Sequence, residues 1–105
     1  MANYLLLYHG GSMPEGEDAQ KQVMDAWGAW FGQLGDSLVD GGNPTMPAAK
    51  SISSDGSTSD ASGGNPATGY SVIKADSMDQ AVEKAKGCPV LGGGSSITVY
   101  ETIAM

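Results

Sequence analysis

The chain has few of the residue types that build disulfide-bonded, metal or nucleic-acid sites. Cysteine and histidine occur once each among its 105 residues, as Cys88 and His9. A single cysteine cannot form an internal disulfide, and this pair gives no metal-ligand spacing, so we expect no metal site. Five Lys and Arg residues against twelve Asp and Glu residues give a net charge of −7. Too few cations remain to neutralise a row of phosphates, which argues against nucleic-acid binding.

Long apolar runs are also missing. The stretch MANYLLLYHGG at residues 1–11 is too short for a membrane span and has no basic region before its apolar part. We therefore expect neither a membrane anchor nor a secretory signal. Together with the single cysteine, these absences predict a cytoplasmic protein. A length of 105 residues, 40% of them hydrophobic, suits a single domain over residues 1–105.

Hydrophobic patterning predicts four main strands, two helices and a hairpin. Apolar residues at three- and four-residue steps favour the first helix, and Ser77 with Gln80 matches a capping box for the second. The dipeptide Asp55-Gly56 favours a type I′ turn in the hairpin. The expected ranges are strands at 3–9, 37–40, 69–75 and 96–103, helices at 17–34 and 76–87, and the hairpin at 50–59.

Without the hairpin, the order of elements is βαββαβ, the split βαβ arrangement of ferredoxin-like α+β domains. In this topology two helices cover one face of a four-stranded antiparallel sheet. The first strand is apolar on both faces, with Tyr4, Leu6 and Tyr8 on one side and Leu5 and Leu7 on the other. The uncovered face needs a partner, so we expect a homodimer with two sheets packed face to face.

Several stretches of the chain together carry a resemblance to a known family. They are YLLLYHGG, the Trp-rich first helix, LVDGG, TGYSVIKADSMDQAVEKAKGCP and the closing ITVYET. Together they resemble the YCII-related family, including its DGPF-type branch, over essentially the whole chain. The resemblance implies a ferredoxin-like fold in a dimeric α/β barrel. The family's activity is not established: a recurring histidine and aspartate suggest enzymes, and relatives fused to sigma-factor-like regions suggest a link to transcription regulation.

The chain departs from this family pattern at both of those residue types. The usual helix histidine falls where this chain has Asp25-Ala26-Trp27. The DGPF tetrapeptide falls on residues 60–63, where Asp60 matches the aspartate but Ala61-Ser62-Gly63 does not match the rest. The histidine and aspartate pair is therefore not intact, and His9 could replace the missing imidazole only from a neighbouring strand.

His9 is the candidate proton-transfer group, because imidazole titrates near neutral pH. It ends the first strand beside Gly10-Gly11, where a ligand could approach the backbone. Asp40 and Asp60 are the candidate catalytic carboxylates that would orient its ring. A bland alternative stays open for each residue. A strand-end histidine can simply bond to a loop, and Asp40 and Asp60 can cap turns.

Aromatic side chains are the candidate substrate-binding residues. Two indoles on one helix stripe could form the wall of a site for a flat apolar or aromatic ligand, although core packing explains the same stripe. The tyrosines on neighbouring strands could reach polar partners at a dimer interface. The residues are Tyr8, Trp27, Trp30, Tyr70 and Tyr100.

Two functions remain open from sequence. The first is a small-molecule enzyme with isomerase- or lyase-like acid/base chemistry in a cleft near His9, without a cofactor. The second is a non-catalytic dimeric module that binds a ligand or regulates a partner. The polar segment 43–66 and the departures from the family pattern favour the second function, whereas the suggested activity of the family favours the first.

Overall fold

The computed structural model describes residues 2–10, 15–46, 48–61 and 67–103. Two short 3₁₀ helices, η1 (Gly35–Ser37) and η2 (Pro89–Gly93), accompany the main elements. No helix within these ranges is long and apolar enough to cross a membrane. The elements follow in the order β1 (Ala2–His9), α1 (Glu17–Leu34), β2 (Leu38–Asp40), β3 (Lys50–Ile52), β4 (Thr58–Asp60), β5 (Ala67–Ala75), α2 (Met78–Ala85) and β6 (Ser96–Glu101).

Four strands form an antiparallel sheet in the order β2-β5-β1-β6. β1 lies inside the sheet, pairing with β5 along its whole length and with β6 from Tyr4 to His9. This order, with one helix after β1 and one after β5, confirms the predicted α+β, ferredoxin-like fold. β3 and β4 form a separate two-stranded sheet, inserted between β2 and β5 as expected.

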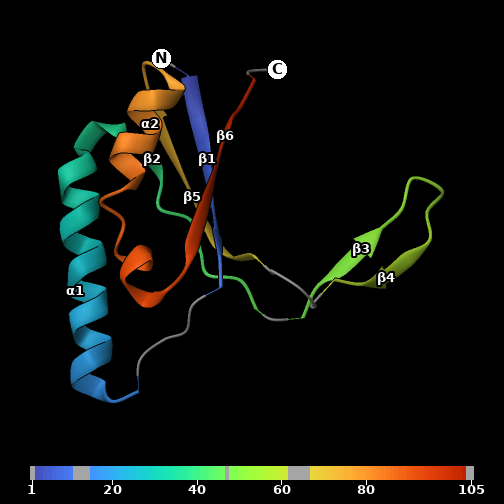
Figure 1. The fold of residues 1–105 in the computed structure, drawn as a ribbon, viewed down its shortest axis with the longest axis horizontal. Coiled ribbons are helices and arrows are strands. Elements are labelled where there is room, and N and C mark those ends of the chain that lie inside the picture. Colours follow the sequence, from blue (N-terminus) through green and yellow to red (C-terminus); the bar gives the residue numbers. More distant parts are fainter. Residues whose placement is uncertain (1, 11–14, 47, 62–66, 104–105) are drawn as a thin grey trace.

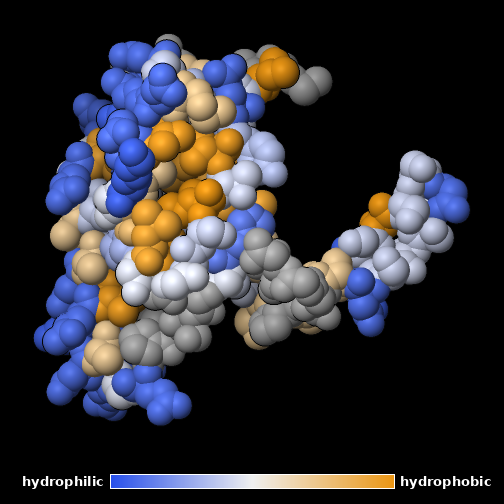
Figure 2. All heavy atoms as spheres, viewed as in Figure 1, coloured by the Kyte–Doolittle hydropathy of each residue, from blue (hydrophilic) through white to orange (hydrophobic). Residues whose placement is uncertain are grey.

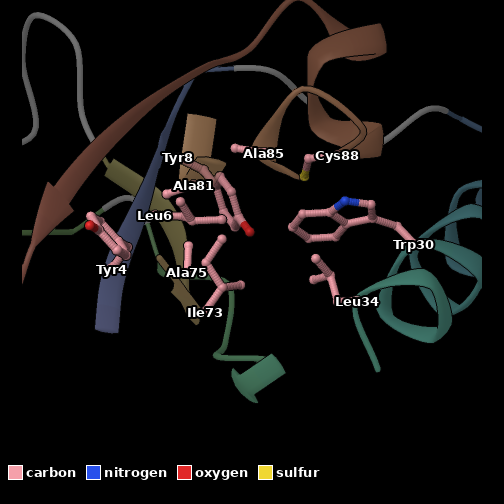
Figure 3. Close-up of a cluster of buried hydrophobic side chains, with 10 residues drawn as sticks. All are labelled: Tyr4, Leu6, Tyr8, Trp30, Leu34, Ile73, Ala75, Ala81, Ala85 and Cys88. Carbon is pink, nitrogen blue, oxygen red and sulfur yellow. The ribbon is translucent and has the colours of Figure 1, made fainter. Parts of the chain in front are cut away.

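The core lies between this sheet and the two helices. Both helices cover the same face (Figure 1), and every second residue of β1 points into the layer between. Figure 3 shows Tyr8 and Ile73 pointing from the sheet towards Trp30 and Leu34 of α1. Trp30 is 3% exposed, and its indole Nε1 donates to the main-chain oxygen of Lys84 at 3.1 Å. This bond ties α1 to the end of α2.

The end of α1 and the start of α2 have the caps that the sequence predicts, with one difference in the hydrogen bonds of Gln80. Gly35 ends α1 with φ at +52°, and its N–H donates to the Phe31 carbonyl. At the start of α2, the Ser77 hydroxyl accepts from the Gln80 N–H at 3.1 Å, which confirms half of the predicted capping box. The Gln80 side chain accepts instead from the N–H of Asp76 at 2.7 Å, one residue before the cap.

No helix of the described residues covers the second face of the sheet, which we call the open face (Figure 1). Strand alternation places on it the residues of β1, β5 and β6 between those of the core. Leu5, Leu7 and Val72 are half-buried there, and Tyr100 is 52% exposed. The open-face residues of these three strands are Asn3, Leu5, Leu7, His9, Tyr70, Val72, Lys74, Ser96, Thr98 and Tyr100.

Residues 50–60 form a hairpin that we call the arm. Figure 1 shows the arm on the opposite side of the sheet from the helices, projecting away from the body. The radius of gyration is 15.1 Å, against about 13 Å for a compact chain of this length. The predicted type I′ turn at Asp55-Gly56 is wrong. A type I′ turn needs positive φ at both central residues, and Asp55 has none. The loop instead runs from Ser53 to Ser57, and the Asp55 carboxylate accepts from the Ser57 N–H at 2.9 Å.

Candidate functional site

A cavity of about 390 Å³ lies between α1 and the start of β5. One wall comes from α1, and the opposite wall comes from residues 41–44 after β2 and from residues 68–70 of β5. Tyr8 and Val90 complete the lining that the described residues provide. The cavity therefore lies on the helix side of the sheet, near the end of β1.

Aromatic rings form the α1 wall. The centroid of the Trp27 ring lies 5.5 Å from that of Tyr8, and the two rings meet edge to face at 70°. Phe31 lies 5.6 Å from Trp27, and Trp30 lies 5.7 Å from it on the core side. These spacings are typical of aromatic clusters that fix each other's orientation. Trp27 is thus held between the core and the open space of the cavity.

The opposite wall depends on Gly42, whereas Gly41 has room for a methyl group. Gly42 has φ at +74°, and a Cβ at this position would lie 1.7 Å from the main-chain oxygen of Tyr70. A Cβ on Gly41 would meet the Phe31 ring at 3.4 Å. Only a residue without a side chain lets the loop pass this close to β5. Asp40 supports the turn, because its Oδ1 accepts from the Gly42 N–H at 2.8 Å.

Behind the cavity lies a buried polar chain. The Tyr8 hydroxyl donates to Ser71 Oγ at 2.7 Å, and Ser71 Oγ donates to the Gly41 carbonyl at 2.8 Å. Burial raises the pKa of Tyr8 well above its usual value. Burial also raises the pKa of the nearby Cys88 thiol. Both groups therefore stay neutral at physiological pH, and the thiol is not activated as a nucleophile.

The polar groups of the wall lie beside this chain. The Asn43 amide donates to the Tyr70 hydroxyl at 3.4 Å. Thr68 Oγ1 donates to the Gly10 carbonyl at 3.1 Å, joining β5 to the end of β1. Asn43, Thr68 and Tyr70 all line the cavity and are hydrogen-bonding residues without charge.

The five aromatic residues singled out by sequence do not all reach one place. Tyr8, Trp27 and Tyr70 line the cavity. Trp30 lies in the core behind them, as the packing alternative for the helix stripe expects. Tyr100 lies on the open face, where it pairs with Leu5 across β1 and β6.

The three candidate acid/base residues lie apart from these rings. His9 ends β1, opposite Ala67 and Ser96, and strand alternation places it on the open face. Asp40 supports the turn at Gly42. Asp60 lies on the arm, where its exposed carboxylate forms an ion pair with Lys50. None of the three is among the described residues that line the cavity.

Several residues of the site were not found by sequence reasoning. The segment Gly41-Gly42-Asn43-Pro44 was interpreted only as a turn, although it forms a cavity wall. Ser71 is fully buried in β5 and accepts a hydrogen bond from Tyr8. The sequence signal that could have found it is a small polar residue among apolar ones in a strand, because buried polar groups have hydrogen-bond partners. Within the described ranges, no group of three or more His, Cys, Asp or Glu residues could hold a metal ion.

Comparison with known proteins reveals a shared fold. No protein-family model matches the chain, and no curated protein matches its sequence. Among solved structures, 5-chloro-2-hydroxyhydroquinone dehydrochlorinase from Burkholderia phenoliruptrix, in complex with 2,5-dihydroxybenzoquinone, is similar with a TM-score of 0.54. The two chains are 16% identical, and the match covers 94% of this chain and 93% of that one. At this identity the likeness bears on the ferredoxin-like fold alone.

The close approach at Gly42 makes a sharp prediction. Gly42→Ala should lower the free energy of unfolding by about 2 kcal/mol or more, because the added methyl meets backbone and the positive φ is strained. Gly32→Ala is the matched control, since nothing lies within 4 Å of its Cβ position and alanine favours a helix by up to ~1 kcal/mol. Urea unfolding measures both, and equal stability of the two variants would contradict the close approach of this loop to β5.

Proposed function

We propose that the protein is a small-molecule enzyme that holds an uncharged ring in the cavity beside α1 and acts on it by proton transfer. The aromatic-walled cavity carries this proposal. Its volume of about 390 Å³ falls within the ~300–1,000 Å³ typical of small-ligand sites. The Trp27 and Phe31 rings offer flat apolar surface, which favours a flat partner.

The charge of the ligand follows from the lining. The described lining residues include no Asp, Glu, Lys, Arg or His. An ionised ligand would lose its hydration there without gaining a charged partner, which is costly. Asn43 and Thr68 instead suit one or two neutral oxygen substituents on one edge of the ring. A hydroxylated or carbonyl-bearing ring is therefore the ligand class that we propose.

His9 is the residue to which we assign the proton transfer. It ends β1 one position after Tyr8, and its neighbour on β5 is Ala67, next to Thr68. Strand alternation places the His9 side chain on the open face and the cavity lies on the helix side, so this assignment requires the bound ring to extend past the end of β1 to reach His9. In this proposal Asp40 supports the site through the Gly42 turn. Asp60, on the arm, is the second carboxylate that we retain as a candidate.

The structural neighbour is compatible with this proposal. That protein is named as a dehydrochlorinase, and its structure holds 2,5-dihydroxybenzoquinone, a six-membered ring with oxygen substituents. The neighbour is thus an enzyme whose ligand is a small ring. Membership in the YCII-related family, which the sequence stretches suggest, is part of the same proposal.

Ligand class is tested with benzene rings that carry either neutral hydroxyl groups or an ionised carboxylate. Phenol and hydroquinone should bind to the protein in calorimetric titrations, and benzoate should bind at least about tenfold more weakly because its carboxylate finds no cation in the described lining. Val23→Phe should abolish binding by filling the cavity from α1. Met78→Ala, on α2 outside the lining, is the control and should leave affinity unchanged. Equal binding of benzoate would contradict the proposed ligand class.

Proton transfer is tested with cyclohex-3-enone, a neutral ring. His9 would take a proton from the carbon between the carbonyl and the double bond, the double bond would shift, and His9 would return the proton to the far carbon. The wild type should accelerate this isomerisation, and His9→Gln should lower kcat by about a hundredfold, the scale of general acid–base catalysis. The affinity of the His9→Gln variant for phenol should equal that of the wild type, because His9 lies outside the described lining of the cavity. Retained turnover in His9→Gln would overturn its assignment.

A non-catalytic binding module is the alternative function. The separation of His9, Asp40 and Asp60 in the fold favours it, because they lie at the end of β1, at the Gly42 turn and on the arm. Phenol binding without any acceleration of the isomerisation by the wild type would favour this alternative over the enzyme.

We also propose that two copies pair through their open faces. Leu5, Leu7 and Val72 leave apolar surface half exposed there. On β1, β5 and β6 this face carries no carboxylate, although the chain has a net charge of −7. Lys74 is its one fully charged side chain on these strands. Asp40 of β2, opposite Val72, is the carboxylate at the edge of this face, and the three long strands can meet a second copy without strong repulsion.

The pairing predicts a concentration-dependent dimer. Leu7→Asp should give a folded monomer in sedimentation equilibrium, because it places a carboxylate in the middle of the open face of both copies. Met78→Asp adds the same charge on the helix side and should remain dimeric. A wild type that is monomeric throughout, or a Leu7→Asp variant that pairs normally, would contradict this arrangement.

A further inference from the structure

We infer that the arm clasps the second copy: in the dimer, the arm of each protomer leaves its own body and packs along the side of its partner. This inference rests on the proposed pairing of the open faces and adds a second contact to it. It depends on three features of the arm: its lack of support within its own chain, its direction and its side chains.

The arm lacks support within its own protomer. All residues of β3 and β4 are exposed. The Lys50–Asp60 ion pair has side chains that are 73% and 75% exposed, and such surface pairs add little stability. An isolated two-stranded hairpin is marginally stable in water. Its root is nevertheless bonded, since the Ala61 N–H donates to the Ala49 carbonyl at 3.0 Å. A partner surface would supply the missing burial.

The direction of the arm matches this role. The arm projects on the open-face side of the sheet (Figure 1), and Figure 2 shows a hollow between the arm and the body. Packed sheets lie about 10 Å apart, and each strand residue advances about 3.4 Å. Each strand of the arm has three residues, so the arm spans about 10 Å before its turn, which is enough to reach the level of the sheet of a second copy. The arm and the open face then hold the same partner from two sides.

The two faces of the arm differ in chemistry. Ile52 pairs with Thr58, and Lys50 pairs with Asp60, so these four side chains share one face. Ser51 and Ser59 pair on the other face. Ile52 is 73% exposed in the single chain. Because the charges of Lys50 and Asp60 neutralise each other, the Ile52 face can meet an acidic partner without adding negative charge. We assign the Ile52 face to the contact.

The affinity of the dimer tests the clasp. In sedimentation equilibrium, Ile52→Ser should weaken dimerisation by about a hundredfold or more, because one buried isoleucine is lost from each of two equivalent contacts. Replacing residues 51–59 with Asn-Gly removes the arm and should weaken it at least as much. Ser51→Ala, one residue away on the other face, is the matched control and should stay within about twofold of the wild type. Far-ultraviolet circular dichroism verifies that each variant folds.

The outcomes separate the clasp from the pairing itself. If the wild type and both arm variants dimerise equally, the clasp is overturned and the pairing of open faces stands. If the wild type is monomeric at every concentration, both are overturned. If arm loss weakens the dimer and Leu7→Asp abolishes it, both are supported.

A mixed dimer shows directly which chain the arm touches. A spin label is attached to Ser54→Cys in a Cys88→Ala background, and this chain, without ¹⁵N, is mixed with ¹⁵N-labelled Cys88→Ala chain. Amide signals of the ¹⁵N-labelled partner should broaden along one side of its body, since the label lies at the end of the arm. In the converse experiment, the spin-labelled chain itself carries ¹⁵N and its partner does not. If only this chain's own signals broaden, the arm packs on its own body and the clasp is overturned.

Discussion

The structure depends on one constraint, the apolar character of both faces of β1. One face is satisfied within the chain: Tyr4, Leu6 and Tyr8 are buried under the two helices. The other face, with Leu5 and Leu7, is left half exposed. A central strand of this kind favours cover on both faces, which the helix layer supplies on one side and the proposed second copy would supply on the other. The cavity lies in the first of these layers, and the proposed dimer covers the second.

The cavity forms where the helix layer is incompletely filled. At the C-terminal end of α1, Trp30 and Leu34 are buried against the sheet, whereas Met24, nearer the N-terminal end, is 62% exposed. The apolar stripe of α1 continues past the part that the sheet covers. The loop after β2 closes the gap from the other side, and its approach is limited by the Tyr70 backbone.

Much of the fold follows from sequence, but less of the site does. Periodicity located every main element with bounds that differ by no more than two residues, because burial enforces that pattern locally. The same pattern could not separate Trp27 from Trp30, since both lie on one stripe and only the packing of α1 decides which is buried. The turn at Asp55 was misjudged because its carboxylate offers the backbone a local bond that competes with the type I′ geometry. The wall at Gly42 depends on a tertiary approach that no local pattern encodes.

The two walls of the cavity differ in what change they tolerate. The loop wall is fixed, because Gly42 has no room for a side chain and Ser71 holds the neighbouring carbonyl. The α1 wall consists of side chains on the outer half of a helix, where Val23 and Met24 carry no described hydrogen-bonding duty in the core. Substitutions there would change the shape of the cavity without disturbing the sheet. The same folding core can therefore carry cavities of different shape, with the difference confined to one turn of α1.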